Sequence, residues 1–266
     1  MAEIEQIEQI EILDMENNKI NMTKPFIMVI DNDECIGSWG DLSQLYSLHE
    51  IFNKTPSVET FSNLLIQTGC VRPYLREFYD TVLKMKSDGM ILKIYMCTAA
   101  KNIKKWVSFL HLILEHWYGK KIYDGIIDGE LIHEWHVANN TQEINSIGIL
   151  KDMNQIRKIA NVDINTPVVA LDDRPTNILN GYRIKISPFF VAINLVGILR
   201  LYFSHWDDID MYLVKTTYNN SLQQSWVRYL TNSEQFTNAS SDLIVLHIAN
   251  YLLEIFNNWK DNNIII

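Results

Sequence analysis

Three short apolar runs, each followed by polar residues, dominate the hydrophobic pattern of the chain. They cover residues 26–30, 91–96 and 168–171 and consist largely of aliphatic side chains. Uninterrupted apolar runs of this length predict buried parallel strands. In residues 75–83 and 103–113, apolar positions recur every three or four residues, which predicts helices between the strands. Strands alternating with helices predict an α/β fold, a doubly wound parallel sheet.

The remaining segments predict how the domain is extended. Residues 1–22 are acidic and are expected to form a solvated arm rather than a docking helix. The main domain is placed at residues 23–205, with a small helical insert or cap at residues 36–70. Glycine and asparagine pairs in residues 122–147 indicate turns or a hairpin. Residues 206–266 are expected to form a helical C-terminal extension, most clearly at residues 244–256.

Net charge and cysteine content argue against several classes of protein. The net charge of −9 argues against broad binding to nucleic acid or to acidic membranes, because phosphate attracts clusters of Lys and Arg. The three cysteines form no CxxC pair, which is typical of a reducing compartment. The acidic start is unlike a signal peptide, and no apolar run is long enough to span a bilayer. We expect a soluble intracellular protein, cytoplasmic or nuclear.

Polar side chains follow each of the three predicted strands. Asp31 and Asp33 follow the first strand, Thr98 follows the second, and Asp172 and Asp173 follow the third. Ligands of doubly wound folds bind at this carboxyl edge of the sheet. Converging carboxylates need a cation to neutralise them, and a set of oxygen ligands selects Mg²⁺. Mg²⁺ would bring a phosphate to a carboxylate that can attack it, which predicts phosphoryl transfer through an aspartyl-phosphate.

Five segments resemble the motifs of one family, in the right order. The branch's DxDET, RPxLxEF, FTAS, KDL and DNSP or DDSP motifs correspond here to Asp31-Asn-Asp-Glu-Cys35, Arg72-Pro-Tyr-Leu-Arg-Glu-Phe78, Met96-Cys-Thr-Ala-Ala100, Lys151-Asp-Met153 and Leu171-Asp-Asp-Arg-Pro175. The chain thereby resembles the HAD superfamily, and within it the FCP/SCP (NLI-interacting factor-like) phosphatases that act on the RNA polymerase II C-terminal tail. The resemblance covers residues 23 to about 200.

The resemblance implies a role for each catalytic residue. Asp31 would be the nucleophile, and Asp33 the general acid and base. Thr98 would hold the phosphoryl group. Lys151 would neutralise that group and keep Asp31 ionised. Lys158 is the rival lysine for this position.

The resemblance also implies a cofactor and a partner. Mg²⁺ would be bound by Asp172 and Asp173, together with Asp31 and the backbone carbonyl of Asp33. The substrate would be a phosphorylated protein or peptide, with the RNA polymerase II C-terminal tail as the partner that the family suggests. Lys101, Lys104 and Lys105 follow Thr98 and are read as a solvated helix face, with a basic rim for a phosphopeptide as the alternative.

Departures from the family pattern leave other functions open. Cys35 stands where Thr is usual, Asn32 replaces Leu, and the helical pattern of residues 36–70 replaces β-structure. Cys35 and Cys97 flank the predicted site, but neither begins a Cys-x5-Arg loop of a thiol phosphatase. His133 and His136 are expected to be surface residues. A phosphatase of small metabolites or nucleotides, and a non-catalytic interaction module on the same fold, remain the alternatives to a protein phosphatase.

Overall fold

Strand β1 (Phe26–Asp31) lies at the centre of a five-stranded parallel sheet with the order β3-β2-β1-β5-β7. In this computed structural model the described residues are 12–14, 18, 22–51, 54–101, 105–144, 148–189 and 242–263. All six residues of β1 are buried, which explains its unbroken apolar run. The other strands of the sheet are β2 (Ile91–Cys97), β3 (Gly125–Ile127), β5 (Val168–Asp172) and β7 (Tyr182–Lys185).

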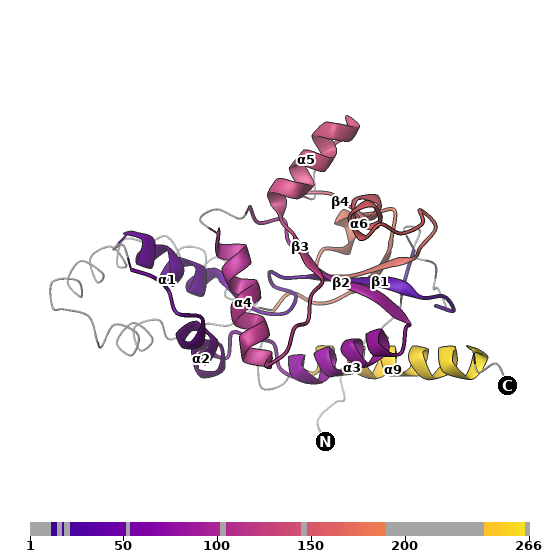
Figure 1. The fold of residues 1–266 in the computed structure, drawn as a ribbon, viewed down its shortest axis with the longest axis horizontal. Coiled ribbons are helices and arrows are strands. Elements are labelled where there is room, and N and C mark those ends of the chain that lie inside the picture. Colours follow the sequence, from indigo (N-terminus) through magenta and orange to yellow (C-terminus); the bar gives the residue numbers. More distant parts are fainter. Residues whose placement is uncertain are drawn as a thin grey trace, which may run out of the picture.

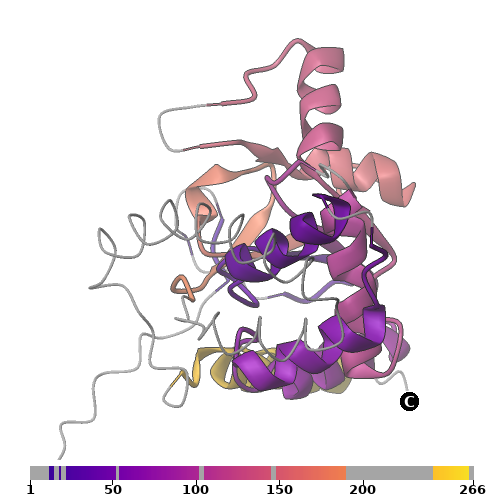
Figure 2. The ribbon, with the colours of Figure 1, turned by 90° about the vertical axis from the view of Figure 1, so that its left-hand side faces the viewer.

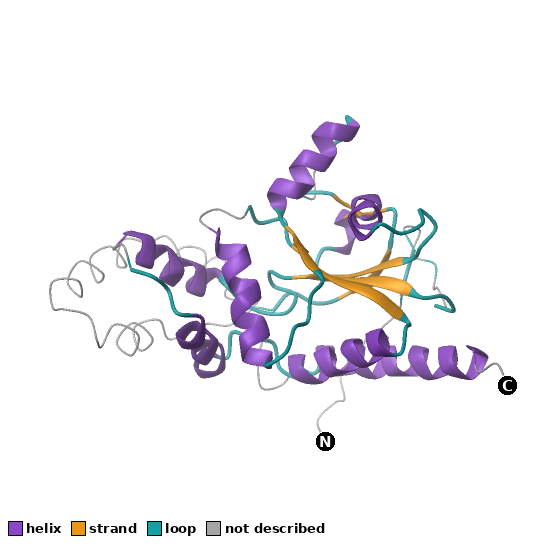
Figure 3. Ribbon diagram, viewed as in Figure 1, coloured by secondary structure: helices purple, strands orange, loops and turns teal. Residues whose placement is uncertain are grey.

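Helices cover both faces of this sheet (Figures 1 and 3). The described helices are α1 (Gly40–Ile51), α2 (Val58–Thr68), α3 (Leu75–Ser87), α4 (Trp106–Tyr118), α5 (Gly129–Asn139), α6 (Met153–Ala160) and α9 (Ile244–Asn263). A short second sheet pairs β4 (Lys151–Asp152) with β6 (Ile178–Leu179), and a 3-10 turn, η2, covers Pro175–Asn177. The predicted doubly wound α/β fold is confirmed.

Alternate side chains of β1 enter two separate cores. Met28 and Ile30 pack into the larger core, to which α3, α4 and α9 contribute. Ile27 and Val29 face the other way and pack with Met153 of α6. Because successive strand residues point to opposite faces, one strand anchors both helical layers. Its carboxyl end is therefore held firmly in place.

The prediction of turns or a hairpin at residues 122–147 is wrong for most of the segment, although Asn140 ends a helix in the left-handed conformation and Ile144 forms an antiparallel bridge with Ile149. This segment holds edge strand β3 and helix α5, which projects away from the sheet in Figures 1 and 2. The glycines that suggested turns lie in tight packing instead. A Cβ at Gly125 would lie 3.0 Å from the Tyr95 ring, and one at Gly129 would lie 2.4 Å from the Ala99 carbonyl oxygen. Asp128 then caps α5 by accepting hydrogen bonds from two backbone N–H groups.

The predicted helical insert at residues 36–70 contains α1 and α2. Ser57 caps the start of α2, and Gly69 ends it in the left-handed conformation (φ 63°). Helix α2 packs against α4, on the left of Figure 1. The Arg72-Pro73 pair precedes the next helix, α3, which begins at Leu75.

Both ends of the described chain pack on the main domain. Ile12 is fully buried and Leu13 forms an antiparallel bridge with Arg183 of β7, which differs from the solvated arm expected there. Helix α9 packs beside α3 under the sheet (Figure 1). Residues 190–241, which include most of the expected C-terminal extension, lie outside the described residues. Among the described helices, none has the length and apolar content that crossing a membrane requires.

Candidate active site

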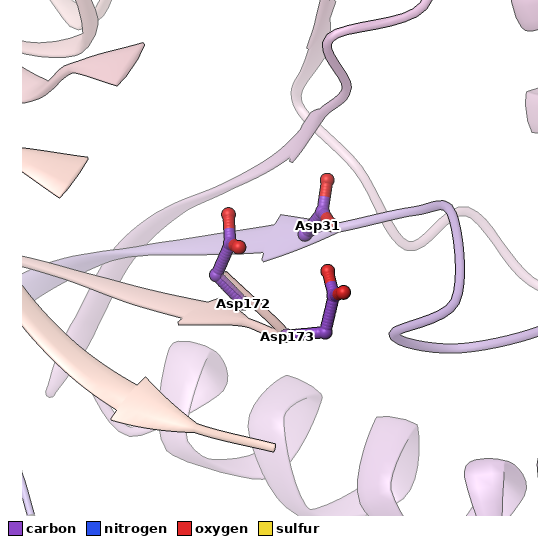
Figure 4. Close-up of side chains that lie close together, drawn as sticks. All are labelled: Asp31, Asp172 and Asp173. Carbon is purple, nitrogen blue, oxygen red and sulfur yellow. The ribbon is translucent and has the colours of Figure 1, made fainter. Parts of the chain in front are cut away.

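Three carboxylates meet at the carboxyl ends of β1 and β5 (Figure 4). Asp31 is the last residue of β1 and Asp172 the last residue of β5, and these strands are parallel neighbours. Asp173 follows directly. One oxygen of each carboxylate lies within 4.8 Å of the others. The sheet register thus brings together residues that are far apart in the sequence.

Lys151 connects two of these carboxylates. Its Nζ lies 2.7 Å from Oδ1 of Asp31 and 2.7 Å from Oδ2 of Asp172. The rival Lys158 is exposed, and its Nζ lies 5.5 Å from the centroid of the Trp135 ring. The structure therefore places Lys151, and not Lys158, in the site.

Asp33 and Thr98 form a second contact beside the first. The hydroxyl of Thr98 donates a 2.6 Å hydrogen bond to Oδ2 of Asp33 and accepts one of 3.0 Å from the backbone N–H of Ala100. Thr98 is fully buried, whereas Asp33 is half-buried and lines the pocket. In this conformation the hydroxyl orients Asp33 instead of facing a substrate.

The burial of these charges strongly perturbs their titration. Burial raises the pKa of Asp31 well above its ordinary value, against the opposing effect of Lys151, and Asp172 raises that pKa further. Burial and then Asp172 raise the pKa of Asp173. Burial alone would lower the pKa of Lys151, but the two carboxylates that it contacts raise it well above its usual value. The lysine therefore stays charged beside the two carboxylates that it contacts.

These residues fit a divalent metal ion. Three carboxylates against one ammonium leave two negative charges at full ionisation. Oδ2 of Asp173 is buried and accepts no hydrogen bond from the described residues, although Nε of Arg174 lies 3.5 Å away. A hard cation with oxygen ligands, such as Mg²⁺, suits this set. Asp31, Asp172 and Asp173 would hold it.

The carboxylates open into a cavity of about 250 Å³. Glu34 and Arg174 also line it, and sequence reasoning gave neither of them a role. Nη2 of Arg174 lies 3.3 Å from Oε2 of Glu34, and the Arg174 side chain is 59% exposed. The position of Arg174 directly after Asp173 was the available signal, because it extends the polar strand end by one residue.

The loop after Asp31 is held from several sides. The thiol of Cys35 donates to the carbonyl of Leu171 in β5 at 3.7 Å, and Nε1 of Trp39 donates to the carbonyl of Asn32 at 3.0 Å. Burial raises the pKa of the Cys35 thiol well above its usual value, so the thiol stays protonated. Cys35 thus serves as a structural donor.

Two expectations about neighbouring residues change. His136 is buried, and its ring nitrogens lie within hydrogen-bonding distance of Thr141 and of the Leu150 carbonyl, so the surface prediction is wrong for this residue. It packs there because α5, which the sequence did not predict, lies over residue 150. His133 is exposed and contacts Glu143. Lys101 and Lys105 are exposed, whereas Lys104 lies outside the described residues.

Comparison with known proteins gives two similar structures. No family model matches the chain, and no curated protein matches it. One similar structure is the fission yeast RNA polymerase II CTD phosphatase Fcp1, a variant bound to beryllium fluoride, with 14% identity over 90% of this chain and a TM-score of 0.42. The other is Fcp1 described as an essential RNA polymerase II CTD phosphatase, with 15% identity over 90% of this chain and a TM-score of 0.40.

Both structures belong to the class of phosphatase that the sequence motifs resemble. The chain spans 65% and 64% of the length of these two chains. At such low identity and TM-score the likeness carries no argument about activity, substrate or partner.

Proposed function

We propose that this chain is a Mg²⁺-dependent phosphomonoester hydrolase with Asp31 as its nucleophile. One observation carries the proposal. The ammonium of Lys151 lies 2.7 Å from both Asp31 and Asp172, at the edge of the sheet where Asp173 completes an acidic cluster. A purely structural ion pair needs one carboxylate for one lysine, whereas this cluster has three.

The residues divide the reaction into two steps. In the first, a carboxylate oxygen of Asp31 attacks phosphorus, and the bond from phosphorus to the leaving oxygen breaks as Asp33 donates a proton to that oxygen. In the second, Asp33 takes a proton from water, the water oxygen attacks phosphorus, and the bond to Asp31 breaks. Phosphate leaves and Asp31 is restored. Bound Mg²⁺ would offset the negative charge of the phosphoryl oxygens.

Two further residues support these steps. Thr98 orients the Asp33 carboxylate through the 2.6 Å hydrogen bond, and it would reach a phosphoryl oxygen once Asp33 turns toward the substrate. Lys151 places a positive charge beside the attacking carboxylate, which stabilises the charge on the transferring group. Arg174, at the mouth of the cavity, offers an exposed guanidinium to an incoming anion.

The shape of the site favours a phosphorylated protein or peptide as substrate. No residue of α1 or α2 lines the cavity, so these two helices of the insert do not close over it. Exposed Lys101 and Lys105 follow Thr98 and can attract an acidic phosphopeptide. We therefore propose phosphoserine or phosphothreonine as the substrate class, with the RNA polymerase II C-terminal tail as the first partner to test.

A substrate panel tests this proposal. Purified protein is assayed for phosphate release from phosphopeptides, sugar phosphates, nucleotides and an aryl phosphate, with Mg²⁺ and with EDTA. We expect Mg²⁺-dependent release, fastest from phosphoserine peptides, and loss of release in Asp31→Asn, because an amide is not a nucleophile here. Faster turnover of a sugar phosphate or nucleotide than of every peptide would make the protein a metabolite phosphatase. Release unaffected by Asp31→Asn would refute the mechanism.

Beryllofluoride gives a second, static test. It mimics a phosphoryl group on a carboxylate, so it should raise the thermal stability of the wild-type protein when Mg²⁺ is present. We expect no such rise in EDTA or in Asp31→Asn. An equal rise in all three conditions would place its binding elsewhere on the protein.

A further inference from the structure

Arg72 is a buried arginine that contacts three separate segments of the chain. Its Nη1 donates to the carbonyl of Cys35 at 2.7 Å, its Nη2 donates to the carbonyl of Ser187 at 2.7 Å, and its Nε donates to Asp242 at 2.9 Å. The guanidinium also lies over the ring of Phe189, 5.2 Å from the centroid. Only 2% of Arg72 is exposed. A rigid guanidinium can hold these acceptors only in one orientation.

Asp242 is the group that sets this orientation. Its Oδ2 accepts from Arg72, while its Oδ1 accepts a 3.1 Å hydrogen bond from the backbone N–H of Ile244, at the start of α9. One carboxylate therefore caps the C-terminal helix and neutralises the buried guanidinium. A buried charge without its partner is strongly unfavourable, so the position of Asp242 fixes the position of the Arg72 guanidinium.

The contacts from Asp242 through Arg72 lead to the proposed active site. The carbonyl that Arg72 holds belongs to Cys35, two residues after the proposed general acid Asp33. In the same loop, the backbone N–H of Glu34 donates to the Gly37 carbonyl, and the N–H of Phe189 donates to the Glu34 carbonyl. Glu34 itself has a φ of 62°, an uncommon conformation that its surroundings must maintain.

We infer that Arg72 and Asp242 are positioning residues that fix the loop of Asp33 through the docked start of α9. This inference rests on the proposed function. It gives the C-terminal helix a role in the geometry of the active site, and not only in the core. When the pair is broken, the chain should stay folded while residues 34–37 lose their fixed position relative to Asp31.

The test uses Asp242→Asn in the full-length chain. Asparagine has the size of aspartate but is neutral, and its NH2 group replaces one of the two oxygens that accept separately from Arg72 and from the N–H of Ile244. The first measurement is hydrogen–deuterium exchange of the peptide that contains residues 34–37. We expect exchange of these amides to rise about tenfold or more, because their hydrogen bonds open more often.

Leu252→Ala is the matched control. Leu252 is fully buried on α9, so its truncation destabilises the helix contact without touching Arg72 or Asp242. Both variants are compared at a temperature where circular dichroism shows them folded. Exchange that rises equally in both variants, or in neither, would overturn the inference. If Asp242→Asn does not fold, Arg72→Lys replaces it, because lysine keeps the charge beside Asp242 but cannot hold both carbonyls.

The second measurement is the rate of phosphate release. A misplaced reacting group costs up to about a hundredfold in rate. We expect Asp242→Asn to lower kcat by about 10- to 100-fold with KM nearly unchanged, and Leu252→Ala to keep the wild-type kcat. A changed exchange rate with an unchanged kcat would also overturn the inference. If the wild-type protein hydrolyses nothing, the proposed function fails, and the exchange measurement alone decides whether the pair positions the loop.

Discussion

Replacing Lys151 by Met tests the electrostatics of the site most directly. The substitution removes the ammonium but keeps a side chain that fills much of the same space. Lys151 Nζ lies 2.7 Å from both Asp31 and Asp172, and the Lys151 side chain is 6% exposed. Removing one partner of a buried ion pair costs about 3–5 kcal/mol, whereas an exposed pair contributes about 0.2–1 kcal/mol. We expect the buried value here, because two carboxylates lose their partner together.

The assay is urea unfolding in EDTA, followed by far-ultraviolet circular dichroism. Lys158→Met is the control, since Lys158 is exposed and its charge contacts only the Trp135 ring among the interactions that the structure records. Lys158→Met should lower the free energy of unfolding by about 1 kcal/mol or less. In thermal unfolding, each kcal/mol corresponds to about 2–4 °C for a protein near this size. Lys151→Met should therefore melt well below Lys158→Met.

Lys151→Met could instead lower the free energy of unfolding by less than about 1 kcal/mol, or by no more than Lys158→Met does. In that case the contact of Lys151 with the two carboxylates does not stabilise the folded protein as a buried ion pair would. Mg²⁺ supplies a further comparison. At one hundred times its dissociation constant a ligand adds about 2.7 kcal/mol of stability, and this gain should require Asp172 and Asp173.

Three other outcomes follow from single contacts. Thr98→Val removes the hydroxyl that orients Asp33, so kcat should fall by about tenfold or more while the protein stays folded. Cys35→Ser replaces the thiol donor by a hydroxyl donor, so the variant should retain most of the wild-type rate of phosphate release. Although burial alone would raise it, hydrogen bonds from Lys86 and a backbone N–H hold the pKa of Asp124 below its usual value. Asp124→Asn should therefore lose stability in urea at pH 7, and the deficit should shrink as the pH falls below about 4.

The central part of the fold follows from local patterns. Strands β1, β2 and β5 are largely buried, so their sequences are apolar runs that a short window detects. The parallel arrangement then requires their carboxyl ends to meet. For this reason the sequence alone suffices to place Asp31 and Asp172 together, although they pair through Lys151 only in the folded chain.

Other parts of the fold carry no such local signal. Strand β3 has three residues at the edge of the sheet, and its glycine packs closely against the Tyr95 ring, which is distant in sequence. Arg72 reads as part of a helix-start motif, yet its partner Asp242 lies 170 residues further along the chain. Pairs of this kind depend on tertiary packing, and neither periodicity nor capping patterns reveal them.

The residues of the proposed site are therefore held in place in two different ways. Asp31 and Asp172 stand at the ends of paired strands, where a change of register would be needed to separate them, and Lys151 contacts both from β4 of the second sheet. Asp33 stands on a loop whose position depends on hydrogen bonds from elsewhere in the chain, including those of Arg72 to Cys35 and of Cys35 to Leu171. Substitutions that weaken the loop should therefore impair proton transfer and leave the ion-paired cluster intact. Binding of Mg²⁺ should survive such substitutions even where turnover does not.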